Sequence, residues 1–157
     1  YRVLEKNLLM FYTGTTRSAG SILAEQKKNT TNDEAKINNL HKMVQLSKDL
    51  KEELLKGNIN AMGEILHTGW MYKKELANGI SNPDIDYYYD LAMQNGALGG
   101  KLLGAGGGGF LLFYVEEQHR SRVRKALQGL KEINFSFDSK GTQLIYYNKR
   151  DLYRRVV

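Results

Sequence analysis

The chain has 157 residues, enough for one compact domain with a hydrophobic core. It is 41% hydrophobic and 25% charged, with a single proline, which is typical of a globular protein and argues against disorder. The absence of cysteine excludes disulfides and cysteine-based metal or catalytic sites, and it fits a reducing compartment. No apolar run is long enough to span a bilayer. We therefore expect one cytoplasmic domain over residues 1–157 with no membrane partner.

The net charge of +6 allows an anionic partner such as a nucleic acid or a phosphorylated metabolite. The sequence starts at Tyr1, without an initiator methionine, and it carries no signal peptide. We therefore expect the chain to be a fragment of a longer protein.

The first elements follow from short apolar patterns. Residues 8–12 form a continuous apolar run ending near a glycine, which favours a buried strand. A polar turn then precedes a helix around Ile22. The pair Thr31 and Glu34 has capping-box spacing, so it predicts the start of a long amphipathic helix that Gly57 ends.

Two further helices are expected before the sequence pattern changes. Asn58 can cap a helix with apolar residues on one face, and Gly79 would end it. Pro83 suits the first position of the next helix because its missing donor is not needed there. Asn95 and Gly96 would close that helix.

The last third of the sequence has strand-like patterns around one helix. Strands are expected at 101–103, 110–115, 133–137 and 143–147, and an amphipathic helix at 116–130. Taken with the first strand, the order is that of a split βαβ unit. The predicted fold class is α+β: a ferredoxin-like split βαβ sandwich with extra helices inserted after the first strand.

A glycine-rich loop at 104–109 is the most informative segment. Glycine costs conformational entropy on folding, so this cluster indicates either positive φ angles or a close approach by another backbone or an anion. A Walker loop is excluded because Lys101 is followed by Leu102, not by Ser or Thr. The spacing also matches G-x-G-x-x-G, but the loop leads into the apolar run at Phe110, a strand and not a helix.

The segment KLLGAGGGGFLLF at 101–113 resembles the third motif of the GHMP kinases. In that family the motif belongs to the C-terminal, ferredoxin-like half and lies against the nucleotide-phosphate loop of the N-terminal half. LMFYTGTTRSA at 9–19, GALGGK at 96–101, and Trp70 with Lys73 and Lys74 resemble the heptose-phosphate branch. That branch acts on D-glycero-D-manno-heptose 7-phosphate.

The resemblance implies an ATP- and Mg²⁺-dependent kinase that phosphorylates the anomeric hydroxyl of the heptose phosphate in nucleotide-heptose biosynthesis. The loop residues would support the nucleotide loop: Gly104, Ala105, Gly106, Gly107, Gly108 and Gly109. Substrate would be bound by residues of the first turn and of a helix: Thr13, Gly14, Thr16, Arg17, Lys73 and Lys74. An arginine beside hydroxyl groups suits a sugar phosphate, although turns commonly contain these residues for structural reasons alone.

The family's nucleotide loop, P-x-x-x-G-L-G-S-S, is absent from the sequence. We expect ATP, Mg²⁺ and the catalytic residue to be held mainly by a missing N-terminal domain, which would be this chain's partner. The chain alone should then be inactive. Gly107→Val should abolish activity in the intact enzyme while this domain stays folded.

Two other classes remain open. RNA-binding modules share this topology, but their RNP1 pattern has a basic lead and a second glycine, which 109–115 lacks, so nucleic acid is an unlikely partner. A stand-alone ferredoxin-like regulatory module would bind a metabolite without catalysis. Glu64 and His67 lie one helical turn apart, but nothing completes a metal site around them, and no metal ligand is expected.

Overall fold

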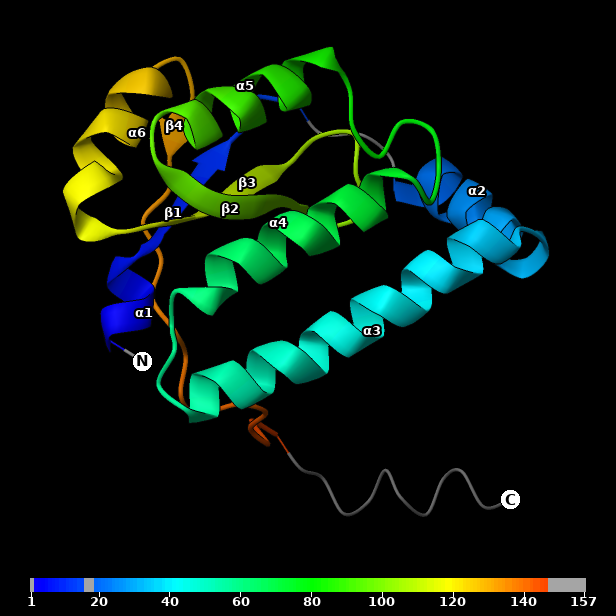
Figure 1. Ribbon diagram of the computed structural model, residues 1–157, viewed down its shortest axis with the longest axis horizontal. Helices are drawn as coiled ribbons and strands as arrows, with labels where there is room; N and C mark the ends of the chain where they lie inside the picture. The colour runs from blue at the N-terminus through cyan, green and yellow to red at the C-terminus, as the bar shows by residue number, and fades with distance from the viewer. Residues whose placement is uncertain (1, 16–18, 147–157) are drawn as a thin grey trace.

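The computed structural model describes residues 2–15 and 19–146 (Figure 1). Its strands are β1 (Leu8–Tyr12), β2 (Ala97–Leu103), β3 (Phe110–Val115) and β4 (Lys131–Glu132). Its helices are α1 (Arg2–Lys6), α2 (Ala19–Asn32), α3 (Glu34–Leu55), α4 (Ala61–Lys74), α5 (Pro83–Gln94), the short 3₁₀ helix η1 (Glu117–His119) and α6 (Arg120–Ala126). Within the described residues, no helix is both long and apolar enough to cross a membrane.

The four strands form one antiparallel sheet in the order β2-β3-β1-β4. In its centre Phe11 of β1 pairs with Leu111 of β3, and on the other side of β3 Leu111 pairs with Leu102 of β2. This strand order is that of the split βαβ plan, with α2 to α5 inserted between β1 and β2. The predicted α+β fold is confirmed.

Helices lie on both sides of the sheet. In Figure 1, α5 and α6 lie above it, α4 and then α3 lie below it, and α2 lies at one end. Tyr89 of α5 is buried against Phe113 of β3, with 5.6 Å between ring centroids, and Trp70 of α4 reaches Tyr89 at 6.2 Å. Tyr89 therefore joins α5 both to the sheet and directly to α4.

Close packing of α4 on β2 explains Gly99 of the GALGGK segment, and also Gly63, which the sequence analysis had not singled out. A Cβ at Gly99 would collide with the carbonyl oxygen of Gly63 in α4. A Cβ at Gly63 would lie 2.5 Å from the Cβ of Leu98. The predicted strand at 101–103 therefore begins earlier, at Ala97, because Gly99 lets the helix approach the strand.

The expected capping box at Thr31 is wrong. Helix α2 continues through this residue, and the Thr31 hydroxyl donates to the Lys27 carbonyl at 2.8 Å, within the helix. The N-cap of α3 is Asp33, whose carboxylate accepts from the amides of Ala35 and Lys36. An acidic side chain therefore caps the helix two residues later than expected.

The start and the end predicted for the next helix are also wrong, whereas the start of the helix after it is correct. The Asn58 side chain donates to Glu53 and does not cap α4, which begins at Ala61 and ends at Lys74, before Gly79. The expected start of α5 is confirmed, because the Asn82 side chain accepts from the Ile85 amide at 3.0 Å.

The C-terminal predictions are mostly wrong. The helix expected at 116–130 is shorter, and the strand expected at 133–137 is replaced by the two residues of β4. Past Ile133, whose amide still bonds to Met10, the chain leaves the sheet, and the Phe137 amide donates to the Glu5 carboxylate. Residues 143–146 form no strand, and Tyr147 lies outside the described residues. Helix α1 was not anticipated.

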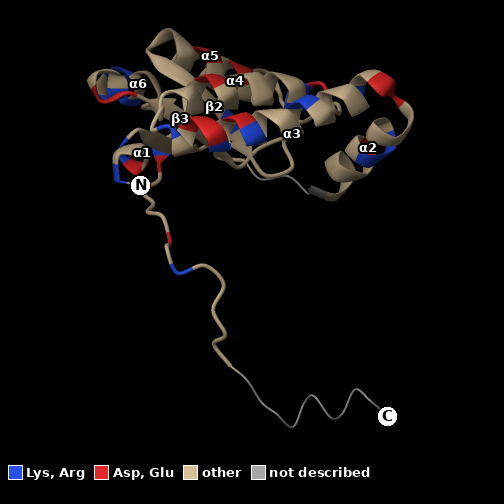
Figure 2. Cartoon of the chain, turned by 60° about the horizontal axis from the view of Figure 1, so that its bottom comes forward, with Lys and Arg blue, Asp and Glu red and all other residues tan. Residues whose placement is uncertain are grey.

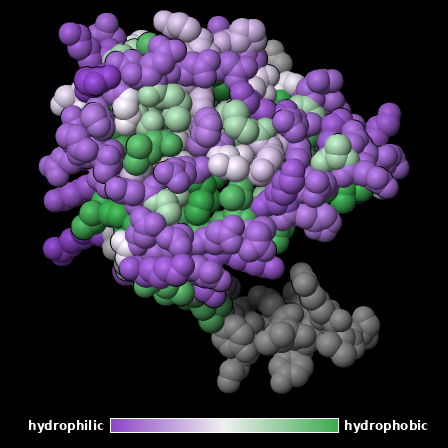
Figure 3. Space-filling view, viewed as in Figure 1, coloured by the Kyte–Doolittle hydropathy of each residue, from purple (hydrophilic) through white to green (hydrophobic). Residues whose placement is uncertain are grey.

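The outer helix α3 carries basic and acidic residues along its length (Figure 2). On the face that carries α3 and α4, apolar side chains form patches among the hydrophilic ones (Figure 3). Helix α3 is thus a largely solvated element that packs mainly against α4 and α2.

Candidate functional site

The glycine-rich loop 104–109 joins β2 to β3 at one end of the sheet. Two other connections meet it there: the segment after β1, and the segment between α4 and α5 (Figure 1). The loop is therefore held by backbone from two distant parts of the sequence.

The segment after β1 bonds to the last glycine of the loop. The Thr13 amide donates to the Gly109 carbonyl at 2.9 Å, and the Gly109 amide donates to the Thr15 carbonyl at 2.9 Å. The Thr13 hydroxyl accepts from the same amide at 3.0 Å and lies 3.1 Å from the Gly109 carbonyl, to which it donates. Thr13 thus fixes the point where the loop enters β3.

The segment before α5 holds the middle of the loop. The Gly107 amide donates to the Ile80 carbonyl at 3.0 Å, and the Asn82 side-chain amide reaches the Gly107 carbonyl at 3.4 Å. Asn82 also caps α5, so one side chain links the helix start to the loop.

Close approach explains two of the loop glycines. A Cβ at Gly106, where φ is +118°, would lie 2.6 Å from the Ile80 Cα. A Cβ at Gly108 would lie 2.5 Å from the Thr15 carbonyl oxygen. Since real Cβ contacts of this length essentially never occur, backbone approaches the loop from both sides at positions where only glycine fits.

A hollow of about 300 Å³ opens beside the loop. Gly107 and Thr15 line it, together with the first residues of α5 at 82–84. The amino end of a helix favours negative charge, but the Asp84 carboxylate also lines this hollow and already supplies it, so the hollow is not by itself a phosphate site.

The expected substrate residues are only partly placed. Thr13 bonds to the loop, and Gly14 is exposed beside it with φ at +79°. Thr16 and Arg17 lie outside the described residues.

Lys73 and Lys74 point to different partners. The Lys73 ammonium donates to the Gln26 side chain of α2 at 2.7 Å. The Lys74 ammonium forms an ion pair with Asp86 of α5 at 3.2 Å. The two neighbouring lysines therefore do not form one site.

Lys73 instead shares a cavity with Lys101, which the sequence reasoning had not placed in a site. Both line a space of about 140 Å³ between α3, α4 and β2, with Trp70 in its wall. Burial lowers the pKa of Lys73 below its ordinary value of 10.5, and the charge of Lys101 lowers it further. A signal was available in the sequence, because Lys101 ends the GALGGK segment.

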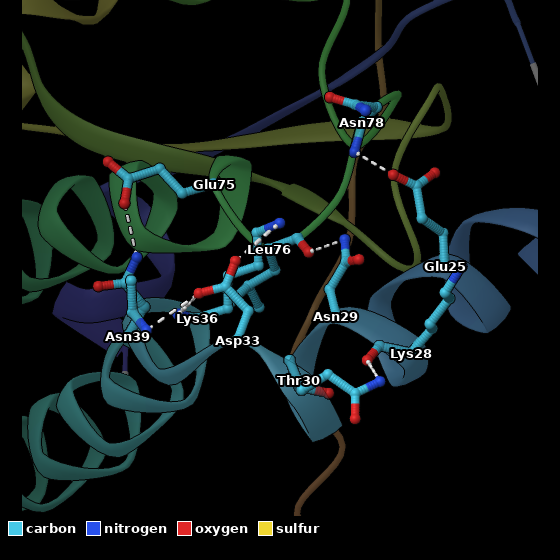
Figure 4. A network of polar contacts seen from close by, with 12 residues as sticks. Glu25, Lys28, Asn29, Thr30, Asp33, Lys36, Asn39, Glu75, Leu76 and Asn78 are labelled. Carbon is cyan, nitrogen blue, oxygen red and sulfur yellow. Dashed lines mark hydrogen bonds and ion pairs between the residues drawn. The ribbon is translucent and has the colours of Figure 1, made fainter.

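A network of polar contacts fixes α2 to the end of α4 (Figure 4). The Asn29 side chain donates to the Leu76 carbonyl at 2.9 Å, and the Glu25 carboxylate accepts from the Asn78 amide at 3.0 Å. These bonds hold the helix that carries Gln26 against the loop end of the sheet.

Of the pair Glu64 and His67, the histidine makes a structural hydrogen bond in the core. His67 Nδ1 lies 2.9 Å from the hydroxyl of buried Tyr89, which donates to the Gly100 carbonyl at 3.2 Å. Across residues 2–15 and 19–146, no group of three or more His, Cys, Asp or Glu side chains could hold a metal ion.

The family model described as GHMP kinases C terminal matches residues 50–132, which include α4, α5, the sheet from β2 onward and the glycine loop. The chain belongs to the GHMP kinase family. GHMP kinases use ATP, so the loop lies in a fold that serves phosphoryl transfer in its relatives.

Two curated relatives are sugar kinases. The chain is 34% identical over 143 residues to the D-glycero-alpha-D-manno-heptose 7-phosphate kinase of Campylobacter jejuni, covering 89% of this chain and 42% of that protein. It is 35% identical over 121 residues to the L-fucokinase/L-fucose-1-P guanylyltransferase of Bacteroides fragilis, covering 76% of this chain and 13% of that protein. This GHMP kinase chain thus spans less than half the length of these relatives.

A solved structure described as a D-glycero-D-manno-heptose 1-phosphate kinase from Bacteroides thetaiotaomicron is also similar. It is 27% identical with a TM-score of 0.56, over 87% of this chain and 34% of that one. Sequence and fold therefore both relate the chain to sugar kinases.

Proposed function

We propose that this chain is the C-terminal part of an ATP-dependent kinase that phosphorylates the anomeric hydroxyl of D-glycero-D-manno-heptose 7-phosphate in nucleotide-heptose biosynthesis. The observation that carries the proposal is the glycine loop, held between Thr15 and Ile80 at contacts that leave no room for a Cβ. The identity to the Campylobacter heptose 7-phosphate kinase supports the choice of substrate. A cytoplasmic location is part of the proposal.

In the proposed reaction, the anomeric hydroxyl oxygen forms a bond to the γ-phosphorus of ATP as the bond to the β-phosphate oxygen breaks. ADP leaves, and the hydroxyl proton passes to a base outside this chain. Such transfer depends on positioning and on neutralising charge, more than on covalent chemistry by the protein.

The residues of this chain position the reactants. Thr13 and Asn82 fix the loop at its end and its middle, so its backbone can support the phosphate-binding segment of the rest of the enzyme. The described residues include no carboxylate cluster for Mg²⁺. Mg²⁺, which would neutralise charge on the phosphates, and most of the ATP contacts are assigned to the N-terminal part of the full-length enzyme.

The direct test is an assay of the full-length protein with ATP, Mg²⁺ and D-glycero-D-manno-heptose 7-phosphate. We expect ADP release that depends on the sugar phosphate, and a new anomeric phosphate signal in the ³¹P spectrum. The coding sequence upstream of Tyr1 should contain P-x-x-x-G-L-G-S-S. Specific sugar-phosphate binding with no ADP formation would instead favour a regulatory module.

A further inference from the structure

The cavity between α3, α4 and β2 carries unbalanced positive charge. Lys73 enters it from α4 and Lys101 from β2. Among residues 2–15 and 19–146, no ion pair joins either ammonium to a carboxylate. Lys74, one residue away, differs in having Asp86 as its counter-ion.

The partner that Lys73 does have is neutral. Its ammonium donates to the Gln26 side-chain oxygen, which satisfies one of its three donors and leaves its charge uncompensated. Each lysine therefore has donors available for a ligand, and the repulsion between the two ammonium groups would be relieved by an anion between them.

Trp70 forms part of the wall of the same cavity. It is 1% exposed, and its indole nitrogen is itself buried, with no hydrogen-bond partner within the described part of the chain. Because that nitrogen is buried, the donors that the cavity offers to a ligand are the two ammonium groups, which are donors only.

The remaining walls suit a charged ligand. Most of the other lining side chains, from α3 and α4, are apolar, and less polar surroundings strengthen the attraction of an ammonium group to an anion. The volume of about 140 Å³ exceeds that of a single water, whose share of liquid volume is about 30 Å³. A tetrahedral group with several acceptor oxygens therefore matches the donors and the space.

We propose that Lys73 and Lys101 bind the phosphate of a phosphomonoester, and that this phosphate belongs to the sugar substrate. Lys101 lies on β2 three residues before Gly104, so the same strand carries a residue of the site and leads into the glycine loop. Lys73 and Lys101 select a phosphorylated sugar over a free sugar. The assignment to substrate rests on the proposed kinase function; the phosphate site itself does not.

The kinetic test uses the full-length enzyme with Lys101→Met and Lys73→Met. Each should raise the KM for D-glycero-D-manno-heptose 7-phosphate at least tenfold and lower the preference for the phosphorylated over the unphosphorylated heptose, while the KM for ATP stays unchanged. Lys101→Arg should restore much of the loss. Lys48→Met is the matched control, because Lys48 is an exposed lysine of α3 that is not among the residues lining the cavity, and it should behave as wild type.

Binding of inorganic phosphate, measured by calorimetry, tests the phosphate site separately from its assignment to the sugar substrate. If the protein phosphorylates no sugar, loss of phosphate binding in both methionine variants still supports the site and removes only the kinase assignment. Lost phosphate binding with an unchanged KM for the sugar phosphate would overturn the assignment to substrate and favour a regulatory ligand. Equal phosphate binding by wild type and variants overturns the site.

Reductive methylation keeps the test decisive if a variant fails to fold. In the wild-type protein, phosphate should protect Lys73 and Lys101 from the reagent and leave Lys48 reactive. Equal labelling of these lysines with and without phosphate contradicts the proposal.

Discussion

Gly108 lies so close to Thr15 that a Cβ on it would stand 2.5 Å from the Thr15 carbonyl oxygen. That oxygen accepts the Gly109 amide at 2.9 Å, so it cannot move away without losing the bond that ends the loop. The glycine at this position is therefore required by its neighbour's backbone, independently of any ligand.

Gly108→Ala should displace the loop from Thr15. Forcing a methyl group into a filled space costs about 1–3 kcal/mol of unfolding free energy. Urea unfolding of the chain should show this loss, and the full-length kinase should lose most of its activity because the loop moves. Gly57→Ala is the control: it also has a positive φ, but open space, and it lies after α3, away from the loop. Equal activity in both variants would contradict the role of the loop.

Thr13→Val should weaken the contact between the segment after β1 and the end of the glycine loop. The substitution keeps the side-chain shape but removes a hydroxyl that both accepts from and donates to Gly109. Because the backbone bond to Thr15 remains, we expect a loss of about 1 kcal/mol in urea unfolding. Thr31→Val removes an exposed hydroxyl bond within α2 and should leave kinase activity unchanged.

Tyr89→Phe should destabilise the chain without changing its shape. The buried hydroxyl bonds to His67 and to the Gly100 carbonyl, and both would lose a partner. Leaving buried polar groups unpaired costs about 1–3 kcal/mol, measurable by thermal or urea unfolding. Tyr87→Phe, on the same helix but 61% exposed, should change stability by less than about 0.5 kcal/mol. A similar effect at both positions would refute the buried network.

Two glycines of α4 should respond to alanine in opposite directions. Gly63→Ala would place a methyl group 2.5 Å from the Leu98 Cβ, so it should lower the unfolding free energy by about 1–2 kcal/mol. Gly69→Ala meets only the Leu46 side chain at 3.7 Å, and alanine is better than glycine in a helix by about 1 kcal/mol. It should stabilise the chain slightly. Urea unfolding of both variants checks the contrast.

Lys101→Met should raise the pKa of Lys73. The pKa of Lys73 is lowered first by burial and second by the charge of Lys101, so removing that charge moves it back toward 10.5 without reaching it. Lysine-selective NMR titration would measure the change. An unmoved pKa would show that the two ammonium groups do not sense each other.

The sign of the stability effect follows from this lowered pKa. On raising the pH, Lys73 loses its proton in the folded chain before it does in the unfolded chain. The cost of burying its charge is therefore present at neutral pH and is relieved as the pH rises through the folded-state pKa toward 10.5. Relative to Lys73→Met, the wild-type chain should gain stability over that range.

The sequence was a reliable guide where one residue type has one structural use. The cap at Asn82 and the glycine loop between two strands both followed from such signals. The sequence was a poor guide where several neighbouring residues could each have capped the same helix. Thr31 and Asp33 can both cap a helix, and the choice of Asp33 depends on where α2 stops.

The candidate site, too, could be predicted from the sequence only in part. The loop glycines could be named from their clustering, but their partners Thr15 and Ile80 are distant in sequence and only the fold brings them together. Lys101 was predicted only as part of a strand, which is correct. Its place in a cavity could not be predicted, because Lys73, which lines the same cavity, lies on a helix 28 positions earlier in the sequence. Alternation in 133–137 suggested a strand, but the Glu5 carboxylate takes the Phe137 amide and sheet pairing ends at Ile133.

The central pairing of β1 with β3 has a consequence for how the chain folds. Phe11 pairs with Leu111, so the two innermost strands are separated by about 100 residues of sequence that form α2 to α5 and β2. During synthesis β1 must wait for β3 to leave the ribosome, whereas α3 and α4 can pair earlier because their contacts are local. Until then the apolar run of β1 has no strand partner, and it is the segment of a nascent chain that a chaperone would be expected to bind.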